Sequence, residues 1–297
     1  MRSRFALFAG LLAVAGGAAL LVGPDAVAAQ TFPPRGMHLI MGNPSNAKSS
    51  AADKNNFLMR KAYFALAYDN AKGTPKWVSW HLSPAYLGSA PRKRSFDTDI
   101  SLPSGFNEIT HKTYNGSGFQ RGHMCPHSDR AANQEMSFAT FVMTNIVPQS
   151  PACNEGSWES LEAYGRYLVR NKGKELFIVS GPIGKGGEGD NGPADTITAG
   201  KLSVTVPAKV FKVILVVDNP GDGSNPTTWA NSHSRLIAVI MPNDMTVEWD
   251  NWPKYRRSVK QVEDETGYKF FTAAPGVTAA MKAKVDDETI PKLPKGH

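Results

Sequence analysis

The sequence predicts an α+β fold, one domain of roughly residues 35–272 built on central antiparallel sheet. Short apolar, β-branched segments come in neighbouring pairs separated by turn residues, as antiparallel strands do. Few segments between them have the length and composition of helices. Hydrophobic residues make up 41% of the 297 residues and charged residues 20%, which is typical of a folded globular protein and not of a disordered one.

The first 29 residues have the layout of a secretory signal peptide. Arg2 and Arg4 precede an apolar run over residues 5–22, and residues 26–28 read Ala-Val-Ala, a small-residue cleavage site. The alternative is an uncleaved membrane anchor, but the run is rich in Ala and Gly and ends at a cleavage site. We therefore expect a secreted or periplasmic product with no stable membrane association after cleavage.

The next elements are an irregular lead-in and a hairpin. Residues 30–56 are rich in Pro, Asn, Ser and Lys, which is typical of irregular chain. Residues 62–68 predict a strand, 70–75 a turn and 77–82 the partner strand. Apolar, β-branched runs predict further strands over 138–147, 176–180, 209–217 and 236–241.

Two helices and two less regular segments complete the order. Residues 154–171 have helical length and composition, and 258–266 predict a short helix stopped by Gly267. A Gly-rich loop spans 184–192. Residues 273–297 contain few large apolar side chains, so we expect a loosely held tail.

The chain is basic, with 33 Lys and Arg against 26 Asp and Glu and a formal net charge of +7. A positive balance suits a polyanionic partner such as nucleic acid. The same charge also serves plain solubility, and charge alone does not choose between these two interpretations.

Five polar residues form a plausible set for phosphodiester chemistry. His123 follows a glycine, and a neutral imidazole is the natural general base near neutral pH. Arg94 and Arg121 offer planar guanidinium groups that suit a phosphate. Asn154 and Glu162 offer hard oxygen atoms for a cation such as Mg²⁺, which usually keeps several of its waters.

Helical spacing supports part of this set, because Asn154, Trp158, Glu162 and Arg166 recur every four residues and share one slowly drifting stripe. Each residue also has a simpler interpretation. Glu162 and Arg166 suit a surface ion pair, Trp158 a core position, and Asn145 a turn or cap.

The order of these residues resembles the DNA/RNA non-specific endonuclease family, whose fold is of the ββα-metal or His-Me finger type. The resemblance covers residues 60–272 and includes an Arg-Ser-Phe stretch at 94–96. The matching residues are Arg121, Gly122 and His123, then Asn145, Pro148 and Gln149, then Asn154, Trp158, Leu161, Glu162 and Arg166.

The resemblance implies a magnesium-dependent active site, with Mn²⁺ as a substitute, carried by a ββα-metal finger. His123 would deprotonate the attacking water, Asn154 would be the direct protein ligand of the hydrated metal, and Glu162 would hold a metal-bound water. The metal would act as a Lewis acid on the phosphate and on the departing 3′ oxygen.

The remaining implied roles concern the substrate. Arg121 and Arg94 would bind the phosphate, Arg166 would share in phosphate or leaving-group contacts, and Asn145 would orient neighbouring groups. The implied activity is endonucleolytic cleavage of DNA and RNA to 5′-phosphate and 3′-hydroxyl ends, by a monomer or homodimer. Contacts to phosphate, sugar and metal carry no base information, so little sequence preference is expected.

One position departs from the resemblance, because Gln120 stands where the family signature has Asp. Gln still makes hydrogen bonds, so we expect activity to persist with a changed rate or pH optimum. The alternative is a catalytically weak secreted module that keeps the fold and binds nucleic acid.

Cys125 and Cys153 flank the two central site residues, and their spacing does not decide between a disulfide and two buried thiols. A zinc site built on His123, Cys125 and His127 is a rival interpretation, although no second Cys/His pair has metal-finger spacing.

Overall fold

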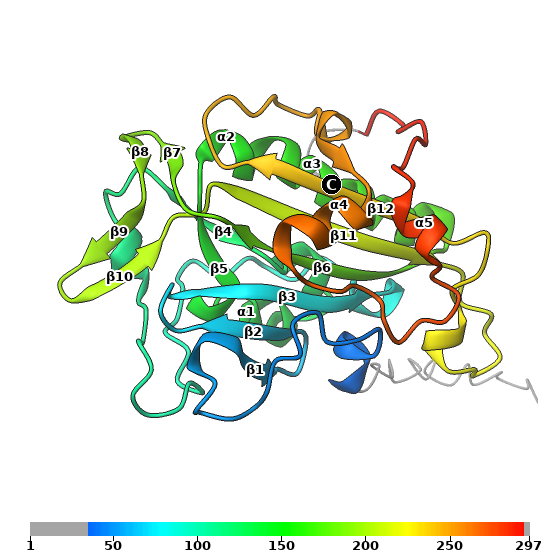
Figure 1. Ribbon diagram of the computed structural model, residues 1–297, viewed down its shortest axis with the longest axis horizontal. Coiled ribbons are helices and arrows are strands. Elements are labelled where there is room, and N and C mark those ends of the chain that lie inside the picture. The colour runs from blue at the N-terminus through cyan, green and yellow to red at the C-terminus, as the bar shows by residue number, and fades with distance from the viewer. Residues whose placement is uncertain (1–34, 294–297) are drawn as a thin grey trace, which may run out of the picture. The chain divides into compact units, whose positions relative to one another are not determined.

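A computed structural model describes residues 35–293, so the predicted signal peptide lies outside the described residues (Figure 1). A seven-stranded sheet forms the centre of the fold, and every strand pairing within it is antiparallel. This confirms the predicted α+β class with central antiparallel sheet. The strands, in sheet order, are β1 (Phe57–Arg60), β2 (Ala65–Asp69), β3 (Thr74–Leu82), β6 (Glu175–Ile183), β11 (Lys209–Val217), β12 (Arg235–Pro242) and β13 (Arg256–Arg257).

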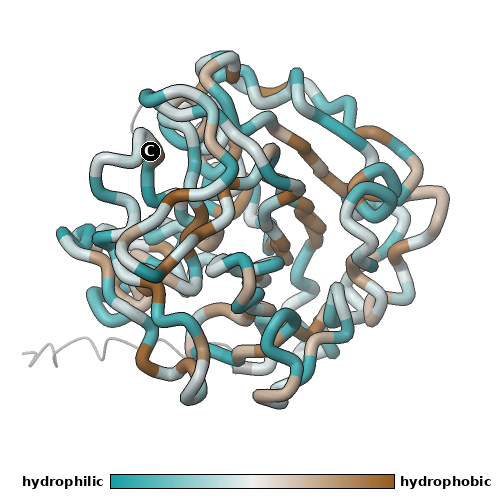
Figure 2. The backbone as a smooth tube through the Cα atoms, turned by 60° about the vertical axis from the view of Figure 1, so that its left-hand side comes forward, coloured by the Kyte–Doolittle hydropathy of each residue, from teal (hydrophilic) through white to brown (hydrophobic). Residues whose placement is uncertain are grey.

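Both faces of this sheet are buried, which explains the long apolar runs within its inner strands β6, β11 and β12. In β11, Val210 and Ile214 belong to one core cluster, whereas Phe211 and Val213 belong to the cluster on the opposite face. Figure 2 shows the inner strands as hydrophobic stretches of the chain. Lys212 is the exception, a charged residue on the same face as Val210 and Ile214.

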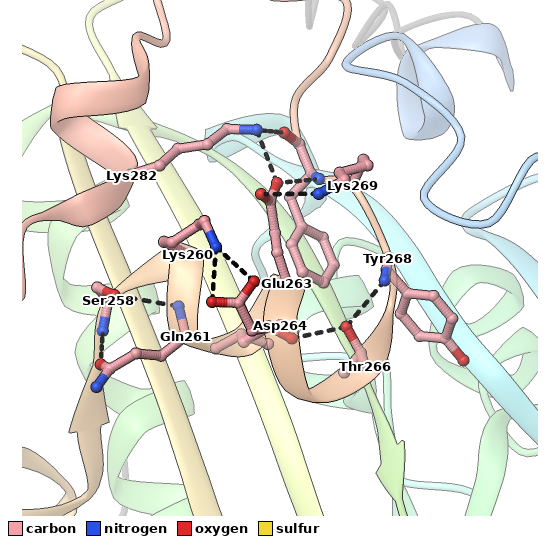
Figure 3. Close-up of polar contacts among 11 residues, drawn as sticks. Ser258, Lys260, Gln261, Glu263, Asp264, Thr266, Tyr268, Lys269 and Lys282 are labelled. Atoms are coloured by element: carbon pink, nitrogen blue, oxygen red, sulfur yellow. Dashed lines mark hydrogen bonds and ion pairs between the residues drawn. The ribbon is translucent and has the colours of Figure 1, made fainter.

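Helices cover the two faces. The helix α3 (Glu159–Lys172) contributes Leu161 to the first cluster, and α4 (Val259–Thr266) contributes Val262 to the second. The capping box of Ser258 and Gln261 starts α4 (Figure 3), and Gly267 ends it with φ 74°. The predicted helix over 258–266 and its stop are therefore confirmed.

A separate pair of antiparallel strands precedes α3. Its strands are β4 (Gln120–His123) and β5 (Ile146–Gln149), with Gln120 opposite Gln149 and His123 opposite Ile146. The Ser150 hydroxyl caps the next turn by accepting from the Cys153 amide at 3.2 Å. The chain then continues through α2 (Pro151–Cys153), a π-helical segment (Asn154–Trp158) and α3.

The predicted strand over 138–147 is wrong for most of its length. Asn133 accepts from the Met136 amide at 3.0 Å and starts α1 (Gln134–Ala139), a short 3-10 helix follows at Met143–Asn145, and only the last two residues enter β5. The apolar side chains in this stretch serve burial rather than a strand, and the upstream helix cap was the missed signal. The predicted hairpin is present as β2 and β3.

Other elements surround the sheet. Small hairpins form at β7 (Gly187–Gly189) with β8 (Gly192–Ala194), inside the predicted Gly-rich loop, and at β9 (Thr196–Ala199) with β10 (Leu202–Thr205). No helix within residues 35–293 has both the length and the apolar character needed to cross a bilayer. Further 3-10 helices lie at Arg35–Leu39, Lys54–Asn56, Pro84–Tyr86, His111–Tyr114, His127–Arg130, Pro226–Thr228 and Trp252–Tyr255.

The expected loose tail makes polar attachments in its described part, up to residue 293. Lys282 lies in α5 (Ala279–Ala283), and its ammonium donates to Glu263 at 2.8 Å and to the Phe270 carbonyl at 2.6 Å (Figure 3). Asp286 is buried and pairs with Arg235 and Arg256. The tail is attached through ion pairs and hydrogen bonds rather than large apolar side chains. Its composition, which is poor in large apolar residues, therefore suggested a looser attachment than the structure shows.

Candidate active site

A cleft of about 530 Å³ lies between the β4–β5 hairpin and the helical segment that follows it. It brings together five of the predicted site residues, and Arg94 and Asn145 do not line it. The lining residues are Arg92, Phe96, Phe119, Gln120, Arg121, His123, Pro126, His127, Ser128, Asn154, Glu155, Glu159, Glu162 and Arg166.

His123 ends β4 on one wall of the cleft, with its ring packed edge-on against Phe141 at a centroid distance of 4.7 Å. Burial lowers the pKa of His123 well below its usual value of 6.5, and the nearby charges of Arg92 and His127 lower it further. The Nε2 atom is buried and has no hydrogen-bond partner within residues 35–293. The imidazole is therefore neutral at neutral pH, the state that a general base requires.

Two side chains position the backbone around His123 without reaching the cleft. Asn145 is fully buried, accepts from the Cys125 amide at 2.9 Å and donates to the Cys125 carbonyl at 2.9 Å. The Trp158 indole donates to the His123 carbonyl at 3.4 Å. Asn145 therefore contacts the backbone just after the end of β4, and Trp158 is a core residue.

Gly122 is required by a close approach across the hairpin. A Cβ atom there would lie 1.9 Å from Oε1 of Gln149, whose side chain is fully buried. Glycine before His123 thus makes room for the predicted motif residue Gln149, rather than for a ligand.

Asn154 lines the same cleft and is the first residue of the π-helical segment, in which Gly156 leaves helical geometry with φ −99° and ψ −118°. The Asn154 amide donates from Nδ2 to Gln120 Oε1 at 2.6 Å. Asn154 Oδ1 accepts no hydrogen bond within the described chain, and the carboxylates of Glu155 and Glu159 line the same cleft. A free amide oxygen fits a divalent cation such as Mg²⁺ or Mn²⁺ that keeps most of its waters.

Glu162 lies eight residues after Asn154, about two helical turns further along. It is paired with Lys212, a residue that the sequence did not suggest. Lys212 donates to Glu162 Oε1 at 2.8 Å, and its ammonium lies 4.0 Å from the centre of the Trp158 ring. Burial raises the pKa of Glu162, and the Lys212 charge opposes that shift. The signal for Lys212 was present, as a lysine in the interior of a strand whose other interior residues are apolar.

Arg166 pairs with a buried carboxylate from outside its own helix, and its charge also lowers the pKa of Glu162. Its Nη1 lies 3.2 Å from Oδ1 of Asp129, whose Oδ2 accepts from the Trp80 indole at 2.9 Å. The charge of Arg166 is therefore held at the cleft wall by a buried carboxylate.

The arginines on the substrate side differ in part from the prediction. Arg121 lines the cleft, donates to the His111 carbonyl at 2.8 Å and lies over the rings of Phe96 and Tyr114. Arg94 is exposed and is not among the lining residues, whereas Arg92, two residues earlier in the same basic run, is one of them. Both arginines are exposed, and residue type alone did not show which of them lines the cleft.

The structure shows the state of the two cysteines and tests the rival zinc site. Cys125 and Cys153 are free and fully buried, and burial raises the pKa of each thiol to about 12. Within residues 35–293, no group of three or more His, Cys, Asp or Glu side chains is placed to hold a metal ion. The geometry therefore gives no support to zinc bound by His123, Cys125 and His127.

The chain is similar in sequence to known nucleases. The chain is 40% identical over 285 residues to a nuclease of Nostoc sp. (strain PCC 7120 / SAG 25.82 / UTEX 2576), covering 94% of this chain and 98% of that protein. It is 31% identical to the human mitochondrial nuclease EXOG, over 70% of this chain and 55% of the relative, so it spans about half of that protein.

The fold comparison agrees. The crystal structure of the EndoG/EndoGI complex matches with a TM-score of 0.67 at 22% identity, covering 86% of this chain and 99% of the matched chain. The model of the DNA/RNA non-specific endonuclease family matches residues 41–276. The chain therefore belongs to the DNA/RNA non-specific endonuclease family.

Proposed function

We propose that this hydrolytic endonuclease uses His123 as general base and Mg²⁺ held by Asn154, and that it is exported. One observation carries the site assignment: the neutral imidazole of His123 and the amide of Asn154, whose oxygen accepts no hydrogen bond within the described residues, line the same cleft. The cleft also holds Arg92, Arg121 and Arg166, which supply the positive charge that a phosphodiester requires.

The chain's own residues perform three tasks in this proposal. His123 accepts the proton of the attacking water, and its low pKa keeps it ready to do so. The arginine side chains bind the phosphate and offset the charge that develops on its oxygens. Asn154 and Glu162 hold the hydrated cation, which when bound supplies Lewis-acid stabilisation of the phosphate and the leaving oxygen. Departure of the 3′ oxygen leaves the phosphate on the 5′ end.

Cleavage of plasmid DNA and of RNA, with Mg²⁺ and with EDTA, tests this proposal. His123→Ala should lower kcat at least about 100-fold, the usual contribution of a general base. The matched control is His233→Ala, which removes an exposed imidazole that does not line this cleft. Equal activity of the two variants would remove His123 from its role.

End labelling tests the product chemistry. Polynucleotide kinase should label the fragments only after phosphatase treatment, because 5′-phosphate ends block labelling. Direct labelling without phosphatase would contradict the proposed ends.

Export is proposed from the signal-like segment at residues 1–29. The N-terminal sequence of protein recovered from the periplasm or medium should begin near residue 29 or 30. Full-length protein confined to the cytoplasm would contradict this proposal.

A further inference from the structure

The Gln120 side chain is hydrogen-bonded to two neighbouring residues of the π-helical segment. Its Oε1 accepts from Asn154 Nδ2 at 2.6 Å, and its Nε2 donates to Oε1 of Glu155. The contacts join the first residue of β4 to the first two residues of the π-helical segment. The three side chains thus form a hydrogen-bonded series that runs from the Glu155 carboxylate, through the Gln120 amide, to the Asn154 amide.

The carboxylate determines the direction of this hydrogen-bonded series. An ionised carboxylate only accepts hydrogen bonds, so Glu155 requires the NH₂ end of the Gln120 amide to face it. The Gln120 oxygen must then face Asn154, and since that oxygen also only accepts, it draws the NH₂ end of Asn154. The amide oxygen of Asn154 is left turned away from Gln120, and only that end of an amide binds a cation.

This orientation matters because Asn154 lies where the helix is irregular. Gly156 interrupts helical geometry two residues later, and the Asn154 side chain is only partly buried. Regular packing alone therefore does not select one of the two amide orientations, which differ only in which end faces the metal.

We propose that Gln120 and Glu155 are positioning residues that fix the Asn154 amide with its oxygen toward the metal. The proposal rests on the proposed function, since it assumes that Asn154 is the metal ligand. It also assigns a role to the position where this chain departs from the Asp of the family signature. Asp is one methylene shorter and has no NH₂ group to give to Glu155.

Direct Mn²⁺ binding in the absence of nucleic acid tests this proposal, measured by the electron paramagnetic resonance signal of free Mn²⁺. Gln120→Leu should weaken Mn²⁺ binding about 10–100-fold, the usual cost of losing a residue that orients a metal ligand. Glu155→Gln should weaken it about 10-fold, because the new amide no longer imposes a direction.

Two variants separate positioning from charge. Glu159→Gln removes the same charge from the same cleft without touching Gln120, and should change Mn²⁺ affinity less than about 3-fold. The exchange Gln120→Glu with Glu155→Gln keeps the net charge and restores the direction, since the carboxylate at position 120 accepts from both neighbours. This double variant should bind Mn²⁺ within about 3-fold of the parent protein.

Equal losses in Glu155→Gln and Glu159→Gln, or no recovery in the exchanged double variant, would overturn the positioning role. Thermal unfolding in EDTA should show unchanged stability for all variants, because both contacts lie at the cleft surface. A parent protein that binds no Mn²⁺, or whose Mn²⁺ affinity Asn154→Ala leaves unchanged, would instead refute the proposed function. The two failures are therefore distinguishable.

Discussion

Replacing Lys212 by Met tests how the interior of the site is held together. Lys212 is 1% exposed, its ammonium is 2.8 Å from Glu162, and it lies over the Trp158 ring. Methionine keeps most of the volume of the lysine stem but removes the charge. Glu162 is then left buried without its partner.

The expected loss of stability follows from the protonation of Glu162 once its partner is removed. A carboxyl group of ordinary pKa 4.5 escapes the loss by binding a proton, which costs at most about 3.4 kcal/mol at pH 7, at about 1.36 kcal/mol for each pH unit. The already raised pKa of Glu162 in the parent protein reduces this difference. Losing the contact of the ammonium with Trp158 adds about 1–2 kcal/mol. The free energy of unfolding should therefore fall by up to about 4–5 kcal/mol at pH 7, in line with other broken buried ion pairs.

The pH dependence gives the reasoning a second test. In the variant, the folded-state pKa of Glu162 lies above the value of 4.5 in the unfolded chain. The pKa of Glu162 is already raised in the parent protein, so the deficit grows as pH rises above the folded-state pKa of the parent and stops growing above that of the variant. Between pH 5 and pH 7 it should grow by up to about 2–3 kcal/mol.

Urea unfolding of both proteins at pH 5, 6 and 7 measures these deficits, with EDTA present so that metal binding does not contribute. Lys209→Met is the matched control, since Lys209 lies in the same strand but is exposed and pairs with Glu265 at the surface. The control should change stability by less than about 1 kcal/mol. A Lys212→Met deficit below 1 kcal/mol at pH 7, or the same deficit at all three pH values, would refute the reasoning.

Three further predictions concern other parts of the molecule. Gly122→Ala should destabilise the fold by about 1–3 kcal/mol in thermal unfolding and lower kcat, since its Cβ would meet Gln149; unchanged values would contradict the close approach. Asp286→Asn should cost about 2–3 kcal/mol in the same assay while kcat stays within about 2-fold, because it anchors Arg235 outside the cleft. In a pH–rate profile, activity should be lost only as pH falls through the lowered pKa of His123; an acid limb at or above 6.5 would contradict this burial effect.

Much of the sheet was predictable because its burial is uniform. The runs at 176–180, 209–217 and 236–241 lie inside β6, β11 and β12, since strands buried on both faces are apolar throughout. The run at 138–147 has a similar composition but forms mainly helical turns. An apolar run records burial, and only its neighbours, here the Asn133 cap, distinguish a strand from a helix.

The site residues that lie close together in the sequence could be predicted from it. Residues 121–166 form one hairpin and the helix that follows, so their order in the sequence is close to their order around the cleft. Lys212 and Arg92 reach the site from elsewhere, through the register of β11 and the path of a loop. Spacing within one segment carries no information about such long-range neighbours.

Cys125 and Cys153 have a practical consequence, since both thiols are enclosed in the core and remain unlinked. No covalent crosslink contributes to the folded state, and thiols with a pKa near 12 react slowly with oxidants at neutral pH. The enzyme should therefore tolerate dithiothreitol and air equally well. Its maturation would require neither an oxidising compartment nor a disulfide-forming partner.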